Sequence, residues 1–123
     1  DIYMLISHNK RKVIWGLMVL VVVILSLLPQ DQISTQLSFN DKVAHFFTYF
    51  TLTFIALLSS NQKHSLLSIL AIQILVGICL EVTQAFIPGR TPEFLDVLAN
   101  SLGVLFGALV YFLFRKIKPI AQN

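Results

Sequence analysis

The sequence predicts an all-α integral membrane protein, a single domain in which residues 1–123 form a four-helix bundle. Two observations predict this class. Hydrophobic residues make up 56% of the chain and charged residues only 12%, whereas a soluble domain carries about 25% charged residues. Four apolar stretches also approach or reach the length that a helix needs to cross the hydrocarbon core, roughly 17 to 25 residues. Lipid is therefore the expected solvent for much of the surface.

The predicted spans cover, in chain order, residues 13–28, 43–58, 66–86 and 94–114. The first is slightly short, but Lys10, Arg11 and Lys12 can extend their charged ends to the membrane surface at its start. Length and lack of alternation favour helices over strands. The alternating segments of about ten residues that are typical of a membrane barrel are not seen.

Prolines and polar residues predict where these helices begin and end. Pro29 ends the first helix, and Asn40 or Asp41 caps the second. Thr91 followed by Pro92 is typical of a helix start, as N-cap and first helical residue of the fourth. The first span is expected to stay in the protein, because LSLLPQDQ after it offers no small-x-small cleavage site of a signal peptide.

The basic residues predict the orientation of the bundle. With four spans, both termini lie on one side, together with seven basic residues: Lys10, Arg11, Lys12, Lys63, Arg115, Lys116 and Lys118. The opposite side has only Lys42 and Arg90. Cytoplasmic loops carry the excess of Lys and Arg. Both termini are therefore expected in the cytoplasm, and the connections 29–42 and 87–93 are expected outside.

This topology brings polar residues from three helices to the outward-facing end. The predicted site has nine members: Asp41, Lys42, His45, Tyr49, Glu81, Gln84, Arg90, Asp96 and Asn100. Spacings of three or four residues place the members of each helix on one face. Glu81 lies more than one turn inside its span, so it should face the bundle and have a partner. Arg90 and His45 are the expected partners.

Structural interpretations stay open for several of these residues. Asp41 can serve only as a helix-start residue that the helix dipole favours. Lys42 and Glu93 can be interfacial groups, and Arg90 can join the turn to a carboxylate. The fourth span continues its polar face with a GxxxG pair, Gly103 and Gly107, which predicts close helix packing.

The same residues resemble the pattern of a known family. The segments DKVAHFFTYFTL and EVTQAFIPGRTPEFLDVLANSLGVLFGAL are similar to the VanZ-like family of small bacterial membrane proteins, with its D-K-x-x-H-F-x-x-Y, E-x-x-Q, P-x-R and D-x-x-x-N-x-x-G motifs. The similarity spans about residues 40–108. It implies a multi-pass protein of the bacterial cytoplasmic membrane, related to a protein linked to low-level resistance to the glycopeptide teicoplanin. The motif residues carry over as the expected site, without assigned roles.

Three functions stay open besides transport, for which four helices are few and no inverted repeat is seen, although an oligomer could form a path. The first is binding or handling of a cell-envelope ligand at the outer leaflet, with membrane lipid and a lipid-linked cell-wall precursor or a glycopeptide as expected partners. The second is an enzyme in which His45, with Asp41 and Glu81, does acid–base chemistry. The third is a structural network that acts through a protein partner. Nucleic-acid binding is not expected, because the basic residues follow the membrane ends of the helices.

Metal-assisted hydrolysis is a variant of the enzyme hypothesis. The plausible ligands are Asp41, His45, Glu81 and Asp96. No strong metal signature such as HExxH is present, so neither a metal nor a cofactor is expected. Whether the protein is an enzyme stays open.

Overall fold

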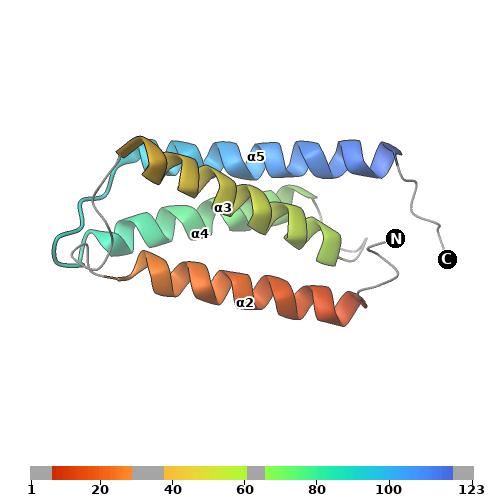
Figure 1. The fold of residues 1–123 in the computed structure, drawn as a ribbon, viewed down its shortest axis with the longest axis horizontal. Helices are drawn as coiled ribbons and strands as arrows, with labels where there is room; N and C mark the ends of the chain where they lie inside the picture. Colours follow the sequence, from red (N-terminus) through yellow and green to blue (C-terminus); the bar gives the residue numbers. More distant parts are fainter. Residues whose placement is uncertain (1–6, 29–37, 61–65, 118–123) are drawn as a thin grey trace.

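The apolar stretches fold into four α-helices in the computed structural model, which describes residues 7–28, 38–60 and 66–117. In chain order the helices are α2 (His8–Ser26), α3 (Ser38–Ser59), α4 (Leu66–Gln84) and α5 (Phe94–Ile117). They run alternately in opposite directions, so the ends of α2 and α4 lie beside the starts of α3 and α5 (Figure 1). The predicted all-α four-helix architecture is confirmed.

Three of these helices are long and apolar enough to cross a membrane: Asp41–Ser59, Leu66–Gln84 and Phe94–Lys116. They match the predicted second, third and fourth spans. The remaining described helix, α2, has the 19-residue length of α4 but carries three cations near its start. Its uncharged part, residues 13–26, is about 21 Å long at 1.5 Å per residue. That is shorter than a hydrocarbon core of about 30 Å, so a full crossing by α2 stays a prediction.

The helix boundaries differ from the predicted ones by a few residues. The second helix begins at Ser38, before the predicted caps, and the fourth begins at Phe94, after Thr91 and Pro92. The third ends at Gln84, not at residue 86, because the next amides bond to carbonyl oxygens three residues back and tighten the chain into a turn. The predicted stop at Pro29 lies outside the described residues.

The GxxxG pair brings α3 and α5 into close contact, as predicted. A Cβ atom on Gly103 would overlap the backbone carbonyl oxygen of Phe46. One on Gly107 would lie 2.5 Å from the carbonyl oxygen of Phe50. Only glycine lets the backbones approach this closely. The two glycines therefore fix how far α5 stands from α3, and with it the register between their side chains.

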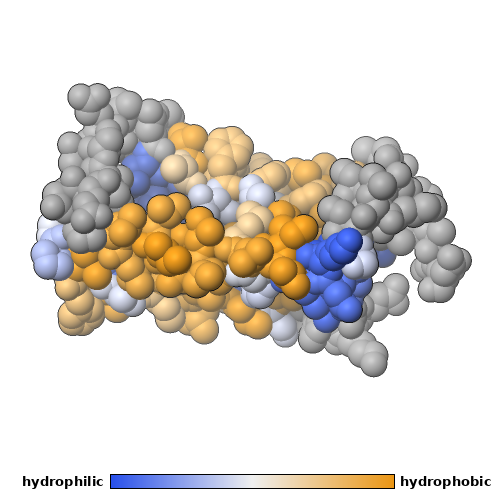
Figure 2. All heavy atoms as spheres, turned by 60° about the horizontal axis from the view of Figure 1, so that its bottom comes forward, coloured by the Kyte–Doolittle hydropathy of each residue, from blue (hydrophilic) through white to orange (hydrophobic). Residues whose placement is uncertain are grey.

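Helix α4 buries polar side chains and exposes large apolar ones. Its buried residues are Gln73, Gly77, Glu81 and Gln84. Its exposed face carries large apolar side chains: Leu67, Ile72, Leu75, Ile78 and Val82. On the face turned forward in Figure 2, hydrophobic residues likewise cover the middle of the bundle and hydrophilic residues gather toward its ends. Apolar groups outside and polar groups inside are expected when lipid is the solvent.

Candidate functional site

Polar side chains of α3, α4 and α5 meet near the end of the bundle where α3 and α5 begin, the end at which α4 also finishes (Figure 1). Five of the nine predicted site residues are buried there: Tyr49, Glu81, Gln84, Asp96 and Asn100. A buried polar group is costly unless it has a partner. The hydrogen bonds of this region therefore show how each predicted residue is used.

His45 connects α3 to α5. Its Nδ1 lies 2.8 Å from Oδ1 of Asn100. An amide oxygen can only accept a hydrogen bond, so Nδ1 donates the proton. The other ring nitrogen, Nε2, lies 3.7 Å from Oδ2 of Asp41, one helical turn earlier on α3. Asn100 thus holds the imidazole ring and directs Nε2 toward Asp41.

Lys42 forms the second connection between the starts of α3 and α5. Its Nζ lies 2.6 Å from Oε2 of Glu93 and 2.9 Å from Oδ1 of Asp96. The Asp96 side chain is only 8% exposed, whereas that of Glu93 is 50% exposed. Lys42 therefore compensates a buried carboxylate, which is more than an interfacial role.

Glu81 has a different partner from the expected ones. Its Oε1 accepts a hydrogen bond of 2.7 Å from the backbone N–H of Glu93. Glu93 directly precedes α5, where backbone N–H groups lack partners and the helix dipole favours a negative charge. Within the described residues, the Glu81 carboxylate therefore binds this amide and stabilises the start of α5. The expected pairing of Glu81 with Arg90 or His45 is wrong.

Arg90 and Gln84 turn instead toward the end of α2. Arg90 donates from Nε to the carbonyl oxygen of Leu28 at 2.9 Å and from Nη2 to that of Leu25 at 3.2 Å. Gln84 donates from Nε2 to the carbonyl oxygen of Ser26 at 2.9 Å. The last carbonyl oxygens of a helix lack intrahelical partners. Both side chains satisfy them and hold α2 against the rest of the bundle.

Gly77 belongs to the site, although sequence reasoning missed it. A Cβ atom there would lie 3.2 Å from the Tyr49 ring and 3.3 Å from Nδ2 of Asn100. Both side chains therefore use the space that the glycine leaves on α4. The sequence does give one indication of this role, because Gly77 stands one helical turn before Glu81 on the same face of the helix. Glu93, first considered as an interfacial group, also joins the site through Lys42.

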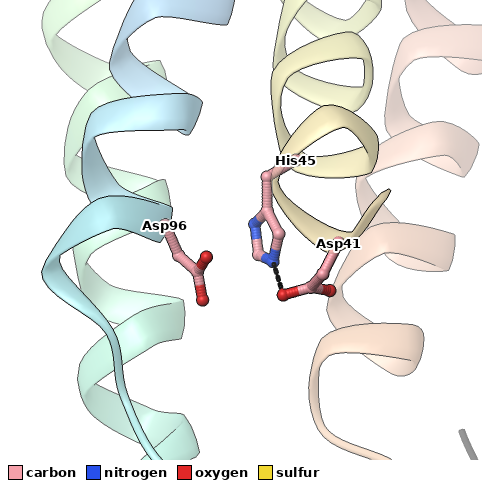
Figure 3. A group of neighbouring side chains, drawn as sticks. All are labelled: Asp41, His45 and Asp96. Carbon is pink, nitrogen blue, oxygen red and sulfur yellow. Dashed lines mark ion pairs between the residues drawn. The ribbon is translucent and has the colours of Figure 1, made fainter. Parts of the chain in front are cut away.

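Three residues place possible metal-binding atoms together. One ligand atom from each of Asp41, His45 and Asp96 lies within 4.8 Å of the others. Figure 3 shows the imidazole and the Asp41 carboxylate on α3 facing the Asp96 carboxylate on α5. Glu81, the fourth ligand considered from the sequence, is not in this group. The site as a whole offers an oriented imidazole, several carboxylates and an ammonium group at the end of the bundle where α3 and α5 begin.

The fold and the site define a small helical membrane protein with a buried polar site at one end. The family model VanZ/LLP1 matches residues 3–115, so the chain belongs to the VanZ/LLP1 family. This confirms the resemblance seen in the motifs.

Among curated proteins, the chain is 35% identical over 80 residues to an uncharacterized protein of Schizosaccharomyces pombe. The alignment covers 63% of this chain and 49% of that protein, so the chain spans about half the length of the relative. No solved structure matches. Because the relative comes from a yeast, the bacterial cytoplasmic membrane stays a prediction.

Proposed function

We propose that this protein binds the polar head group of an amphipathic, membrane-embedded ligand at the end of the bundle where α3 and α5 begin. The observation that carries the proposal is that the charged side chains of the site range from buried to exposed. Asp96 is 8% exposed, but Asp41 is 56% exposed, and its one ion pair with a described residue is the 3.7 Å contact with His45. A network that serves only to join helices needs no such open carboxylate.

The occupied groups limit the chemistry of the ligand. Lys42 is bound to two carboxylates and Arg90 to carbonyl oxygens of α2. The most open charged group of the described site is the Asp41 carboxylate, which accepts hydrogen bonds. A head group rich in hydroxyl or amine donors fits this arrangement better than one that needs a free cation. Lipid-linked cell-wall precursors and glycopeptides offer such donors.

The position of the site supports a ligand that is itself held by lipid. Apolar side chains face outward along α4 and α5, immediately beside the polar end. With the predicted orientation, this end faces the outer leaflet of a bacterial cytoplasmic membrane. Protection against a glycopeptide such as teicoplanin is the cellular role that the family resemblance suggests.

The experiment combines binding and protection. The full chain is placed in lipid nanodiscs, and binding of teicoplanin and of a lipid-linked cell-wall precursor is measured separately. Asp41→Asn should weaken binding several-fold and leave thermal unfolding unchanged, because Asp41 is exposed. Thr51→Val, on an exposed part of α3 where Thr51 bonds only to the carbonyl oxygen of Phe47, is the matched control.

Bacteria that express the same variants are then compared for teicoplanin susceptibility at equal membrane levels. Protection by the wild type and by Thr51→Val, but not by Asp41→Asn, is the expected result. Equal binding by the wild type and Asp41→Asn would contradict the proposal.

The geometry of His45 favours a second candidate, an acid–base enzyme that acts on an envelope lipid. Because Asn100 fixes one ring nitrogen, Nε2 beside Asp41 is the position at which His45 could take up or give a proton. Ser101, next to Asn100 in the sequence, donates to the carbonyl oxygen of Val97 at 2.8 Å, so a water or ligand hydroxyl is proposed as the reacting group. Mass spectrometry of lipids incubated with the wild type and with His45→Gln would detect a product that only the wild type makes.

A further inference from the structure

We propose that Asp41, His45 and Asp96 bind a divalent metal ion of the first transition series, such as Mn²⁺ or Zn²⁺. The three possible ligand atoms lie within 4.8 Å of one another. Two ligands of one ion at about 2.1 Å each stand at most about 4.2 Å apart. The bound of 4.8 Å exceeds this limit by little, so small side-chain adjustments on binding would bring the three atoms within reach of one ion. The proposal goes beyond head-group binding, because the ion would bind whether or not a head group is present.

The orientation of His45 is the second observation. Histidines that bind a metal donate their other ring N–H to a carboxylate or carbonyl group, which fixes the tautomer and the ring. Here Nδ1 of His45 donates to Oδ1 of Asn100 at 2.8 Å, and Asn100 is only 3% exposed. That leaves Nε2 as the ring nitrogen that could bind a metal, and it faces Oδ2 of Asp41 at 3.7 Å (Figure 3).

Helix dipoles do not account for this arrangement. Asp41 and Asp96 lie in the first turns of α3 and α5, where a dipole favours a carboxylate. That effect gives no reason for an imidazole to turn between them. In the described part of the chain, only Oδ1 of Asp96 is taken by Lys42. The other carboxylate oxygen stays available to an ion.

The charges of the site also favour a cation. Among the described residues, four carboxylates lie at this end of the bundle: Asp41, Glu81, Glu93 and Asp96. Lys42 pairs with two of them, Glu93 and Asp96, while Arg90 donates to the carbonyl oxygens of Leu25 and Leu28. A divalent cation would offset the excess negative charge. Lys42 competes with that ion for Asp96, because its Nζ stands 2.9 Å from Oδ1.

The ligand types decide the class of ion. Carboxylates alone suit Mg²⁺ and Ca²⁺, whereas an imidazole ligand shifts preference toward first-row transition metals. Three protein ligands leave at least one coordination position for water or for a group of a bound molecule. The exposed side of Asp41 gives the ion a path from the aqueous phase.

The test uses the full chain in detergent micelles, stripped with a chelator and titrated with Mn²⁺ while the free ion is followed by electron paramagnetic resonance. Asp41→Asn, His45→Gln and Asp96→Asn should each weaken binding by about tenfold or more. Glu93→Gln removes the same charge as Asp41→Asn without removing a ligand, so its effect should be smaller. Lys42→Gln should tighten binding, because it frees Asp96.

A spectroscopic readout separates a ligand from a residue that only supports the fold. Bound Mn²⁺ should show coupling to an imidazole nitrogen in the wild type and in Glu93→Gln, and His45→Gln should remove it. Equal losses in Glu93→Gln and Asp41→Asn would overturn the proposal, since binding would then follow charge alone. Failure of the wild type to bind Mn²⁺ or Zn²⁺ at millimolar concentration would also overturn it. Mn²⁺ binding and its coupling to nitrogen are both measured without a head group. A negative result here would therefore overturn the metal proposal and leave the head-group proposal standing, and the reverse also holds.

Discussion

Replacing Arg90 by alanine should loosen α2 from the bundle. The side chain makes two hydrogen bonds to carbonyl oxygens at the end of α2, one of 2.9 Å and one of 3.2 Å. A hydrogen bond from a charged group contributes about 1.5 to 3 kcal/mol when buried. The second bond is exposed, so its contribution should be well below that range. We expect Arg90→Ala to lower the free energy of unfolding by roughly 2 to 4 kcal/mol.

The assay is reversible unfolding of the purified protein in mixed micelles, followed by circular dichroism. Arg90→Lys keeps the charge but cannot place two donors in a fixed fork, so it should recover about half of the loss. Head-group binding, measured below the unfolding transition, should change little in both variants. A stable Arg90→Ala protein that no longer binds the ligand would refute this reasoning, because it would place Arg90 in the ligand site.

Two further predictions concern α5 and its neighbours. Gly103→Leu should lower the free energy of unfolding by about 1 to 3 kcal/mol or more, since a side chain there would overlap the Phe46 carbonyl oxygen. Gly16→Leu, with nothing within 4 Å, should leave thermal unfolding unchanged, and equal losses in both would contradict the close packing of α3 and α5. Glu81→Gln should cost no more than about 1 kcal/mol, because an amide oxygen can still accept from the Glu93 N–H. Head-group binding by this variant should fall several-fold, whereas parallel losses of stability and binding would favour a purely structural role.

The site residues were visible in the sequence for a local reason. Polar residues in an apolar helix are rare enough to stand out, and their spacing of three or four residues places them on one face. Asp41 with His45, and Asp96 with Asn100, follow this rule on α3 and α5. Gly77 did not stand out, because a glycine carries no polar group that would mark it.

The partners of these residues could not be predicted in the same way. Arg90 is close to Glu81 in the sequence and has the opposite charge, so a pair was the simplest expectation. In the structure Arg90 donates instead to the carbonyl oxygens of Leu25 and Leu28, at and just after the end of α2. Carbonyl oxygens without an intrahelical partner occur at the end of every helix, so the sequence does not identify these as the partners of Arg90. Glu81 then takes the backbone N–H of Glu93.

Composition and helical periodicity are local properties, and they predict the four helices, the membrane-compatible length of three of them and the end of the bundle where polar groups gather. Tertiary structure decided which polar atoms meet. Asp96 lies beside His45 and Asp41 only because Gly103 and Gly107 let α5 approach α3 at one register. The GxxxG spacing predicts close packing of α5 against a neighbour, but which helix that neighbour is, and at which register, depends on packing across the whole interface.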